Sequence, residues 1–127
     1  MHETRIKRLL LAKPEAVEDY PFGPDAAVFK LHGKMFALLF RRHGQLQLNL
    51  KCDPEQAQML RDVFAAVRPG YHMNKRHWNT VLLDGSLPEG EISRMLDHSY
   101  ALIVRGLPRA VRLGLEARHG RDALYPA

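Results

Sequence analysis

The sequence is short of cysteine and of long apolar runs, and each shortage excludes a class of protein. A single cysteine among 127 residues excludes an internal disulfide and any metal site that needs several thiolates. The longest apolar run, at residues 35–40, fits a strand and is far too short to span a membrane. Residues 1–5 lack the apolar core and the small-residue cleavage site of a signal peptide, so the sequence predicts a cytoplasmic location.

Acidic side chains are missing from two long segments, although the whole chain has a formal net charge of only +5. Residues 26–52 and residues 63–83 contain no Asp or Glu. We therefore expect a positive field wherever these segments fold together. The alternative is a solvated basic surface that only keeps the protein soluble. The cations concerned are Lys30, Lys34, Arg41, Arg42 and Lys51 in the first segment and Arg68, Lys75 and Arg76 in the second.

Hydrophobic periodicity switches between the helical and the strand pattern along the chain. The order α-β-β-β-α-β-β-α-α predicts an α+β fold, a two-layer sandwich in which an antiparallel sheet of about five strands packs against helices. We expect a single domain at residues 1–120 and a flexible tail at residues 121–127. The expected elements are a helix at 3–13, a loop at 14–25, strands at 27–31, 34–41 and 45–50, a helix from Pro54 that stops at 68–70, strands at 71–73 and 78–83, a helix that opens at Pro88, and a last helix to about Arg118.

The strand at residues 45–50 alternates strictly between apolar and polar side chains. Leu46, Leu48 and Leu50 lie on one face, and glutamine and asparagine side chains lie on the other. Such alternation is typical of an antiparallel strand that is covered on one side only, so we expect the other face of the sheet to be open, or at least polar. The helix that follows has a strong start, because Asp53 is suited to the N-cap and Pro54 to the first helical position.

The segment at residues 69–80 concentrates hydrogen-bond donors. It contains the only tryptophan, Trp78, and no carboxylate. Its donors are two cationic side chains, two amides and two histidines that donate from both ring nitrogens once protonated. Such a set suits an anionic or hydrogen-bond-accepting partner better than it suits acid–base chemistry. The donors are Lys75, Arg76, Asn74, Asn79, His72 and His77.

Several motifs of the chain resemble the MmcQ/YjbR family of small bacterial proteins, and the resemblance covers nearly the whole sequence. They are Asp-Tyr-Pro-Phe at 19–22, Val-Phe-Lys at 28–30, Gly-Lys-Met-Phe-Ala at 33–37, Asn-Leu-Lys-Cys-Asp-Pro at 49–54, Ser-Tyr at 99–100 and, above all, Pro-Gly-Tyr-His-Met-Asn-Lys-Arg-His-Trp-Asn-Thr at 69–80. The resemblance implies a frataxin-like (CyaY-like) sandwich and carries the family's DNA-binding label. The iron handling of frataxins, which uses acidic ridges, does not carry over, because the strand segments hold no acid.

DNA binding without catalysis is therefore our principal hypothesis. Cations would contact phosphates, asparagines would read base edges, and Trp78 or Tyr71 would stack on an unpaired base. The alternative for Trp78 is a core position, and the alternative for the asparagines is to satisfy backbone groups. The expected DNA- or anion-binding residues are Lys34, Arg41, Arg42, Lys51, His72, Asn74, Lys75, Arg76, His77, Trp78 and Asn79.

Other chemistries have weaker support in the sequence. His72 and His77 are five positions apart and lie on no convincing helix, so we expect no metal and no cofactor. Cys52 precedes a helix start, which can lower the pKa of a thiol, but no base accompanies it and we assign no catalytic residue. The alternative function is a module that binds a protein, as secretion chaperones of this fold do, or a small nucleotide-like anion. We expect no membrane partner.

Overall fold

The computed structural model of the protein describes residues 1–126, and within them an α+β domain is built from helices on one side of a single sheet. The predicted helix at Pro54 is capped as expected, because the Asp53 side chain accepts hydrogen bonds from the backbone N–H groups of Glu55 (3.0 Å) and Gln56 (3.3 Å). The elements are α1 (Glu3–Leu11), β1 (Val17–Asp19), β2 (Ala26–Leu31), β3 (Lys34–Arg42), β4 (Gln45–Lys51), α2 (Pro54–Val63), β5 (Val67–Pro69), β6 (Trp78–Leu82), α3 (Glu89–Gly106), α4 (Arg109–His119) and α5 (Arg121–Leu124).

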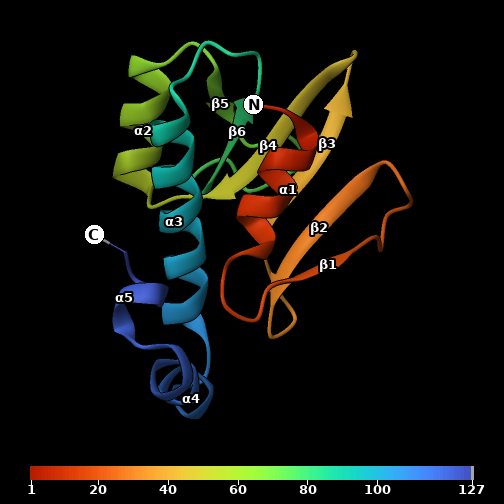
Figure 1. Ribbon diagram of the computed structural model, residues 1–127. Helices are drawn as coiled ribbons and strands as arrows, with labels where there is room; N and C mark the ends of the chain where they lie inside the picture. The colour runs from red at the N-terminus through yellow and green to blue at the C-terminus, as the bar shows by residue number, and fades with distance from the viewer. Residues whose placement is uncertain (127) are drawn as a thin grey trace.

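Among the described residues the sheet has six strands in the order β1-β2-β3-β4-β6-β5, and every neighbouring pair is antiparallel. Figure 1 shows α1, α2 and α3 on the same side of this sheet, with α4 beyond the end of α3 and α5 beside the C-terminal half of α3. The predicted fold class and antiparallel sheet are therefore confirmed, with six strands in place of about five. Within the same residues, no helix combines the length and the apolar character that a membrane crossing requires.

The core lies between the inner face of the sheet and the helices. The alternating leucines of β4 all point inward, and Leu48 pairs in register with Val81, which pairs with Val67. Helix α3 packs against β3 and β4 through the stripe predicted from its sequence, in which Ile92, Met95, Leu96, Ser99 and Ile103 are all buried. Burying an aliphatic side chain of this kind contributes about 1.5–3 kcal/mol, so these contacts hold the two layers together.

A side chain of α3 hydrogen-bonds to the backbone at a β-bulge in β3. Phe29 pairs with Ala37 and Lys30 with Met35, so Phe36 is an extra residue in β3. The hydroxyl of the fully buried Ser99 donates to the carbonyl of Phe36 (2.6 Å) and accepts the backbone N–H of Lys51 (2.9 Å). One helix side chain thus satisfies backbone groups of two strands and fixes where β4 ends.

Two strand predictions differ from the structure. The predicted loop at 14–25 contains β1, a three-residue edge strand, because pairing with β2 orders a segment that has no hydrophobic alternation of its own. The predicted strand at 71–73 is wrong. Helix α2 ends at Val63, where Phe64 turns to extended backbone, and Val67–Pro69 forms the strand instead. The spacing of Val67 fits a helical stripe, but it is a residue of β5 and its side chain is buried in the core.

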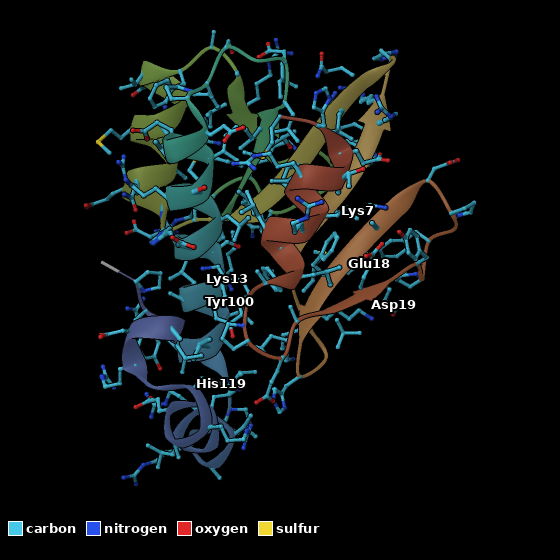
Figure 2. The ribbon with its side chains drawn as sticks, in the orientation of Figure 1. Lys7, Lys13, Glu18, Asp19, Tyr100 and His119 are labelled. Atoms are coloured by element: carbon cyan, nitrogen blue, oxygen red, sulfur yellow. The ribbon has the colours of Figure 1, made fainter. Side chains whose placement is uncertain are left out.

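The Glu15 carboxylate links the C-terminal helix α4 to the rest of the domain. Glu15 accepts hydrogen bonds from Arg118 of α4 (2.8 and 3.1 Å) and lies within hydrogen-bond distance of His119 (2.6 Å) and His32 (2.9 Å). Figure 2 shows His119 on α4, at the end of the molecule farthest from α2. The structure places α5 in the segment expected as a tail, and Leu124 is fully buried. Ala127 lies outside the described residues.

Replacing Glu15 by glutamine tests how strongly this carboxylate holds α4. Hydrogen bonds from Arg118 and His119 lower the pKa of Glu15 from 4.5 to about 2. The folded protein therefore favours the carboxylate, and the stability that Glu15 contributes is present above pH 4.5 and is lost as the pH falls towards 2. We expect Glu15→Gln to lower the melting temperature at pH 7 by about 2–4 °C, since exposed ion pairs are weak, and to have no effect at pH 2.

The control is Asp25→Asn, which removes a carboxylate that has no ion pair among residues 1–126 and should leave the melting temperature unchanged. Thermal unfolding followed by circular dichroism at both pH values measures the difference. An equal effect of Glu15→Gln at pH 7 and pH 2 would show that the charge of Glu15 does not hold α4.

Candidate nucleic-acid interface

The outer face of the sheet, opposite the helices, is polar but not open. Leu38, Asn49, Thr80 and Arg68 follow one another across β3, β4, β6 and β5 on this face. Asn49 is 0% exposed and Thr80 is 2% exposed, although no helix covers them. They are buried because residues 70–77 fold back over them, so the prediction of a polar outer face is confirmed and its openness is not.

A relay of hydrogen bonds holds this loop, residues 70–77, against the outer face of the sheet. The Thr80 hydroxyl accepts the backbone N–H of Tyr71 (2.8 Å) and donates to the side-chain oxygen of Asn49 (2.5 Å). The Asn49 amide nitrogen in turn donates to the carbonyl of Tyr71 (3.0 Å). Both backbone groups of Tyr71 and both polar atoms of Asn49 are thereby satisfied, which is what buried polar groups require.

The start of the loop passes so close to β6 that only glycine fits. The backbone N–H of Gly70 donates to the carbonyl of Trp78 (3.0 Å). A Cβ at position 70 would lie 2.8 Å from the Cβ and 2.9 Å from the carbonyl oxygen of Trp78. Both are shorter than a van der Waals contact, and neither atom can move without shifting β6. The glycine of the sequence motif at 69–80 is thus explained by packing.

The rest of the loop is held by its own side chains. The Asn74 side-chain oxygen accepts the backbone N–H groups of Arg76 (3.0 Å) and His77 (3.3 Å), which forms an Asx turn. The ammonium of Lys75 donates to the carbonyl of Gly70 (2.9 Å), and Arg61 of α2 donates to the carbonyl of Lys75 (2.9 Å). Two of the expected binding residues, Asn74 and Lys75, therefore also stabilise the loop that carries them.

Tyr71 anchors a cation above β3. Its ring stacks on Phe40 with centroids 5.7 Å apart and contacts the ring of His72 at 4.1 Å. The guanidinium of Arg42 lies 4.3 Å from the centroid of Tyr71, within the range of a cation–π contact. This cluster brings Arg42 and His72, which are 30 positions apart in sequence, to the same place on the outer face.

We use the name outer cationic face for six exposed or half-buried side chains on the outer side of the sheet, namely five Lys or Arg residues and His72. In the part of the chain that the structure describes, none of its members makes an ion pair within 4.0 Å. Lys51, the last residue of β4, pairs in register with Trp78, the first residue of β6, and Arg68 lies beside Thr80. The members are Arg42, Lys51, Arg68, His72, Lys75 and Arg76.

Several cations on the opposite side and at the β1 edge are paired with acids. The ammonium of Lys7 lies 3.4 Å from a carboxylate oxygen of Glu18, and Figure 2 shows these residues close together on α1 and β1. Lys30 pairs with Asp19 at 2.9 Å, and this hydrogen bond lowers the pKa of Asp19. Lys13 pairs with Asp97 of α3. The positive charge that remains on the sheet is therefore concentrated at its β3–β6 part.

Three of the expected binding residues lie elsewhere. Lys34 is at the β2–β3 turn and pairs with Leu31, whose side chain is buried in the core on the inner side of the sheet. Arg41 points to the inner face and lies 4.0 Å from Glu3 of α1. Asn79 is 2% exposed, and its amide donates to the carbonyl of Ala57 in α2 (3.3 Å). The alternation of side chains along a strand separates these residues from the outer cationic face.

The histidines and the cysteine are placed as follows. His72 is exposed with φ of 57°, and His77 is half-buried, with its carbonyl accepting the backbone N–H of Cys52 (2.8 Å). Among residues 1–126, no group of three or more His, Cys, Asp or Glu side chains is arranged to hold a metal ion. Burial raises the pKa of the Cys52 thiol to about 11, so it is protonated and unreactive at neutral pH.

Sequence reasoning missed two parts of this face. The sequence pattern predicts Arg68 at the end of a helix, whereas it lies in the edge strand β5. Tyr71 was considered for stacking on bases, whereas its ring packs on Phe40 and Arg42. The polar side chains of β4 are a signal for the position of Tyr71, because polar groups buried on a strand need a covering segment whose backbone groups pair with them.

The fold and this face define a class of small α+β proteins in which a pinned loop carries unpaired cations over the back of an antiparallel sheet. The sequence model of the YjbR family matches residues 11–102, and the chain belongs to that family. All members of the outer cationic face lie within this match.

Relatives with curated sequences support the same assignment. The chain is 38% identical over 109 residues to the uncharacterised protein YjbR of Escherichia coli strain K12, which covers 86% of this chain and 92% of that protein. It is also 38% identical over 109 residues to the uncharacterised protein YbdF of Escherichia coli O157:H7, with 86% and 88% covered. A shorter match, 44% over 61 residues, relates it to the uncharacterised protein YyaQ of Bacillus subtilis strain 168.

Solved structures share the fold. Deinococcus radiodurans protein DR2400, which has a DUF419 domain, superposes with a TM-score of 0.81 at 35% identity, and the match covers 88% of this chain and 86% of that one. The crystal structure of a Pseudomonas syringae protein superposes with a TM-score of 0.72 at 32% identity, and covers 80% of this chain and 98% of that one.

Replacing Gly70 by alanine tests the close approach of the loop to β6. The added Cβ would overlap Trp78, so we expect a loss of about 1–3 kcal/mol in the free energy of unfolding. The matched control is Gly90→Ala in the first turn of α3, where a Cβ would meet nothing within 4 Å, and no loss is expected there. Urea unfolding followed by the fluorescence of the single tryptophan, Trp78, measures both. Equal stability of the two variants would contradict this account of the loop.

Proposed function

We propose that the protein binds DNA through the outer cationic face and does so without catalysing a reaction. The observation that carries the proposal is the gathering of charge on one surface: among the described residues no member of the outer cationic face lies within 4.0 Å of a carboxylate, whereas cations such as Arg5, Lys30 and Arg118 elsewhere do. Unpaired cations on one surface attract a polyanion. A cytoplasmic location, where DNA is accessible in bacteria, is part of the same proposal.

The mechanism would be electrostatic. Each phosphate that a Lys or Arg neutralises releases condensed counterions, and the affinity for duplex DNA then falls with salt with a logarithmic slope of about 0.9 per phosphate contact. The five cations Arg42, Lys51, Arg68, Lys75 and Arg76 set the largest number of such contacts that this face can make.

Preorganisation of the loop supports binding. The relay through Thr80 fixes Tyr71, and Tyr71 in turn orients Arg42, so these groups lose less conformational entropy when a ligand binds. The ammonium of Lys75 uses one of its three protons on the carbonyl of Gly70 and keeps two for a phosphate. The same contacts that hold the loop thus present its charges.

Removing charge from the outer cationic face at two positions tests the proposal. Arg68→Gln together with Arg76→Gln removes two unpaired cations and leaves the loop contacts of Lys75 and Asn74 in place. We expect the affinity for a short duplex to fall by about tenfold or more at moderate salt, and the salt slope to fall by about one for each lost contact. Fluorescence anisotropy at two salt concentrations measures both quantities.

The matched control is Arg8→Gln together with Arg109→Gln, which removes the same charge from exposed helix positions outside the face. Neither of these arginines makes an ion pair among the described residues, so the change in net charge is equal and the expected loss is less than about twofold. If the control variant lost as much affinity as the Arg68/Arg76 variant, the outer cationic face would not be the DNA-binding site. A wild-type protein that fails to bind any duplex at low salt would reject DNA binding.

A second candidate function, a protein-binding module, is favoured by one observation. An apolar depression of about 190 Å³ lies between α2 and α3 and is lined by Met59, Leu60, Val63, Phe64 and Met95, among others. Met59 is 53% exposed and Val63 is 65% exposed, and because both line this depression they form an apolar patch and are not scattered single side chains.

The experiment for this candidate is co-purification of wild type and Val63→Asp followed by mass spectrometry. Val63 faces solvent, so the aspartate should leave the melting temperature nearly unchanged and abolish the retention of any protein bound at this depression. A protein retained equally by both forms would be bound elsewhere, and this would count against the α2–α3 depression as its site.

A further inference from the structure

We infer that the outer cationic face recognises the phosphate backbone of duplex DNA and reads no base sequence, an inference that rests on the proposed function. Sequence-specific binding needs side-chain amides and hydroxyls that are free to meet base edges, and single-strand binding needs exposed aromatic faces on which bases stack. The structure lets each of these groups be followed to its partner.

The buried amides of the sheet are committed to the fold. Asn49 gives its nitrogen to the carbonyl of Tyr71 and its oxygen to the Thr80 hydroxyl, and that hydroxyl also accepts from Tyr71. Asn79 points to α2 on the inner side of the sheet. Gln47 is 6% exposed and lies beneath the same surface. Asn49 cannot reach a base without breaking the relay that holds the loop, Asn79 faces the other side of the sheet, and Gln47 is almost fully covered.

The exposed amides are also partly used. An asparagine reads adenine by offering its oxygen and its nitrogen together. The oxygen of Asn74 already accepts two backbone N–H groups, from Arg76 and His77, so only its nitrogen remains. Gln45, at the other end of β4, gives its nitrogen to the carbonyl of Leu46 (3.1 Å). Asn74 therefore lacks the free oxygen that bidentate recognition requires, and the Gln45 amide is half-buried and turned towards its own backbone.

Aromatic side chains on this face support the loop and its cations. The ring of Tyr71 contacts Phe40, Arg42 and His72. Trp78 is half-buried in β6, opposite Lys51. A base could stack on Tyr71 only by displacing Arg42, which would remove a phosphate contact. Trp78 alone leaves part of its ring accessible, so the face offers little surface on which the bases of a single strand could stack.

What remains available is cationic. Arg42 has one face against Tyr71, and its N–H groups at the edge are free to donate, which suits a phosphate oxygen. Arg68, Lys75 and Arg76 are exposed, and Lys51 is half-buried. Duplex DNA carries about one charge per 1.7 Å of its axis, twice the density of a single strand, so a surface that reads charge alone prefers the duplex.

The experiment measures the affinity of the wild-type chain for nucleic acids of equal length but different composition. The probes are an A·T duplex, a G·C duplex, a mixed-sequence duplex and a single strand of thymidines, each titrated at two salt concentrations. We expect the three duplexes to agree within about threefold and to share one salt slope, and the single strand to bind more weakly.

The differences in affinity between the probes decide whether the inference holds. A preference of more than about tenfold for one duplex would overturn the inference, because specific recognition exceeds non-specific binding by about 10³-fold or more. Tighter binding to the single strand would overturn it as well, since this would require stacking. Either result leaves the proposed function standing. Failure to bind any duplex in a salt-sensitive manner would overturn the proposed function, and this inference with it.

Discussion

The hydroxyl of Thr80 is the group on which the outer surface of this protein depends. It lies between the backbone of Tyr71 and the side chain of Asn49 and is hydrogen-bonded to both. Polar side chains on a sheet face normally remain hydrated, and here they are buried because a loop supplies the missing partners. Through this hydroxyl, a strand pattern that is ordinary for an antiparallel sheet becomes a support for residues 70–77.

The distribution of charge has a structural cause as well. Carboxylates are placed on α1, β1, α2, α3 and α4 and in loops, where they join elements: Glu18 to α1, Asp97 to the chain after α1, and Glu15 to α4. Strands β2 to β6 have no acid, so their cations are compensated only where a strand lies beside β1 or a helix, as Lys30 does beside Asp19. The charge that remains is concentrated where the loop covers the sheet.

The family match ends within α3 and so separates the sheet and α2 from the C-terminal helices α4 and α5. The whole sheet, the loop at 70–77 and most of α3 lie within residues 11–102, whereas α4 and α5 lie beyond them. The added helices are held by buried Leu115 and Leu124 and by the contacts of Glu15, and they contribute no residue to the outer cationic face. The α2–α3 depression lies within the match, so a protein-binding role and a DNA-binding role would belong to the same part of the chain.

The sequence by itself determined the elements whose signals are local. The alternation of Leu46, Leu48 and Leu50 fixed the inner face of β4, Asp53 and Pro54 fixed the start of α2, and the acid-free segments indicated where positive charge would gather. It could not find β1, which is ordered only by its neighbour, or place Val67 in a strand, because helical spacing and burial in a sheet look alike over a few residues. Which cations meet was decided by tertiary structure alone. Arg42 and His72 come together because a loop folds across three strands, and Lys34, Arg41 and Asn79 are kept apart from them because strand position and pleat point their side chains elsewhere.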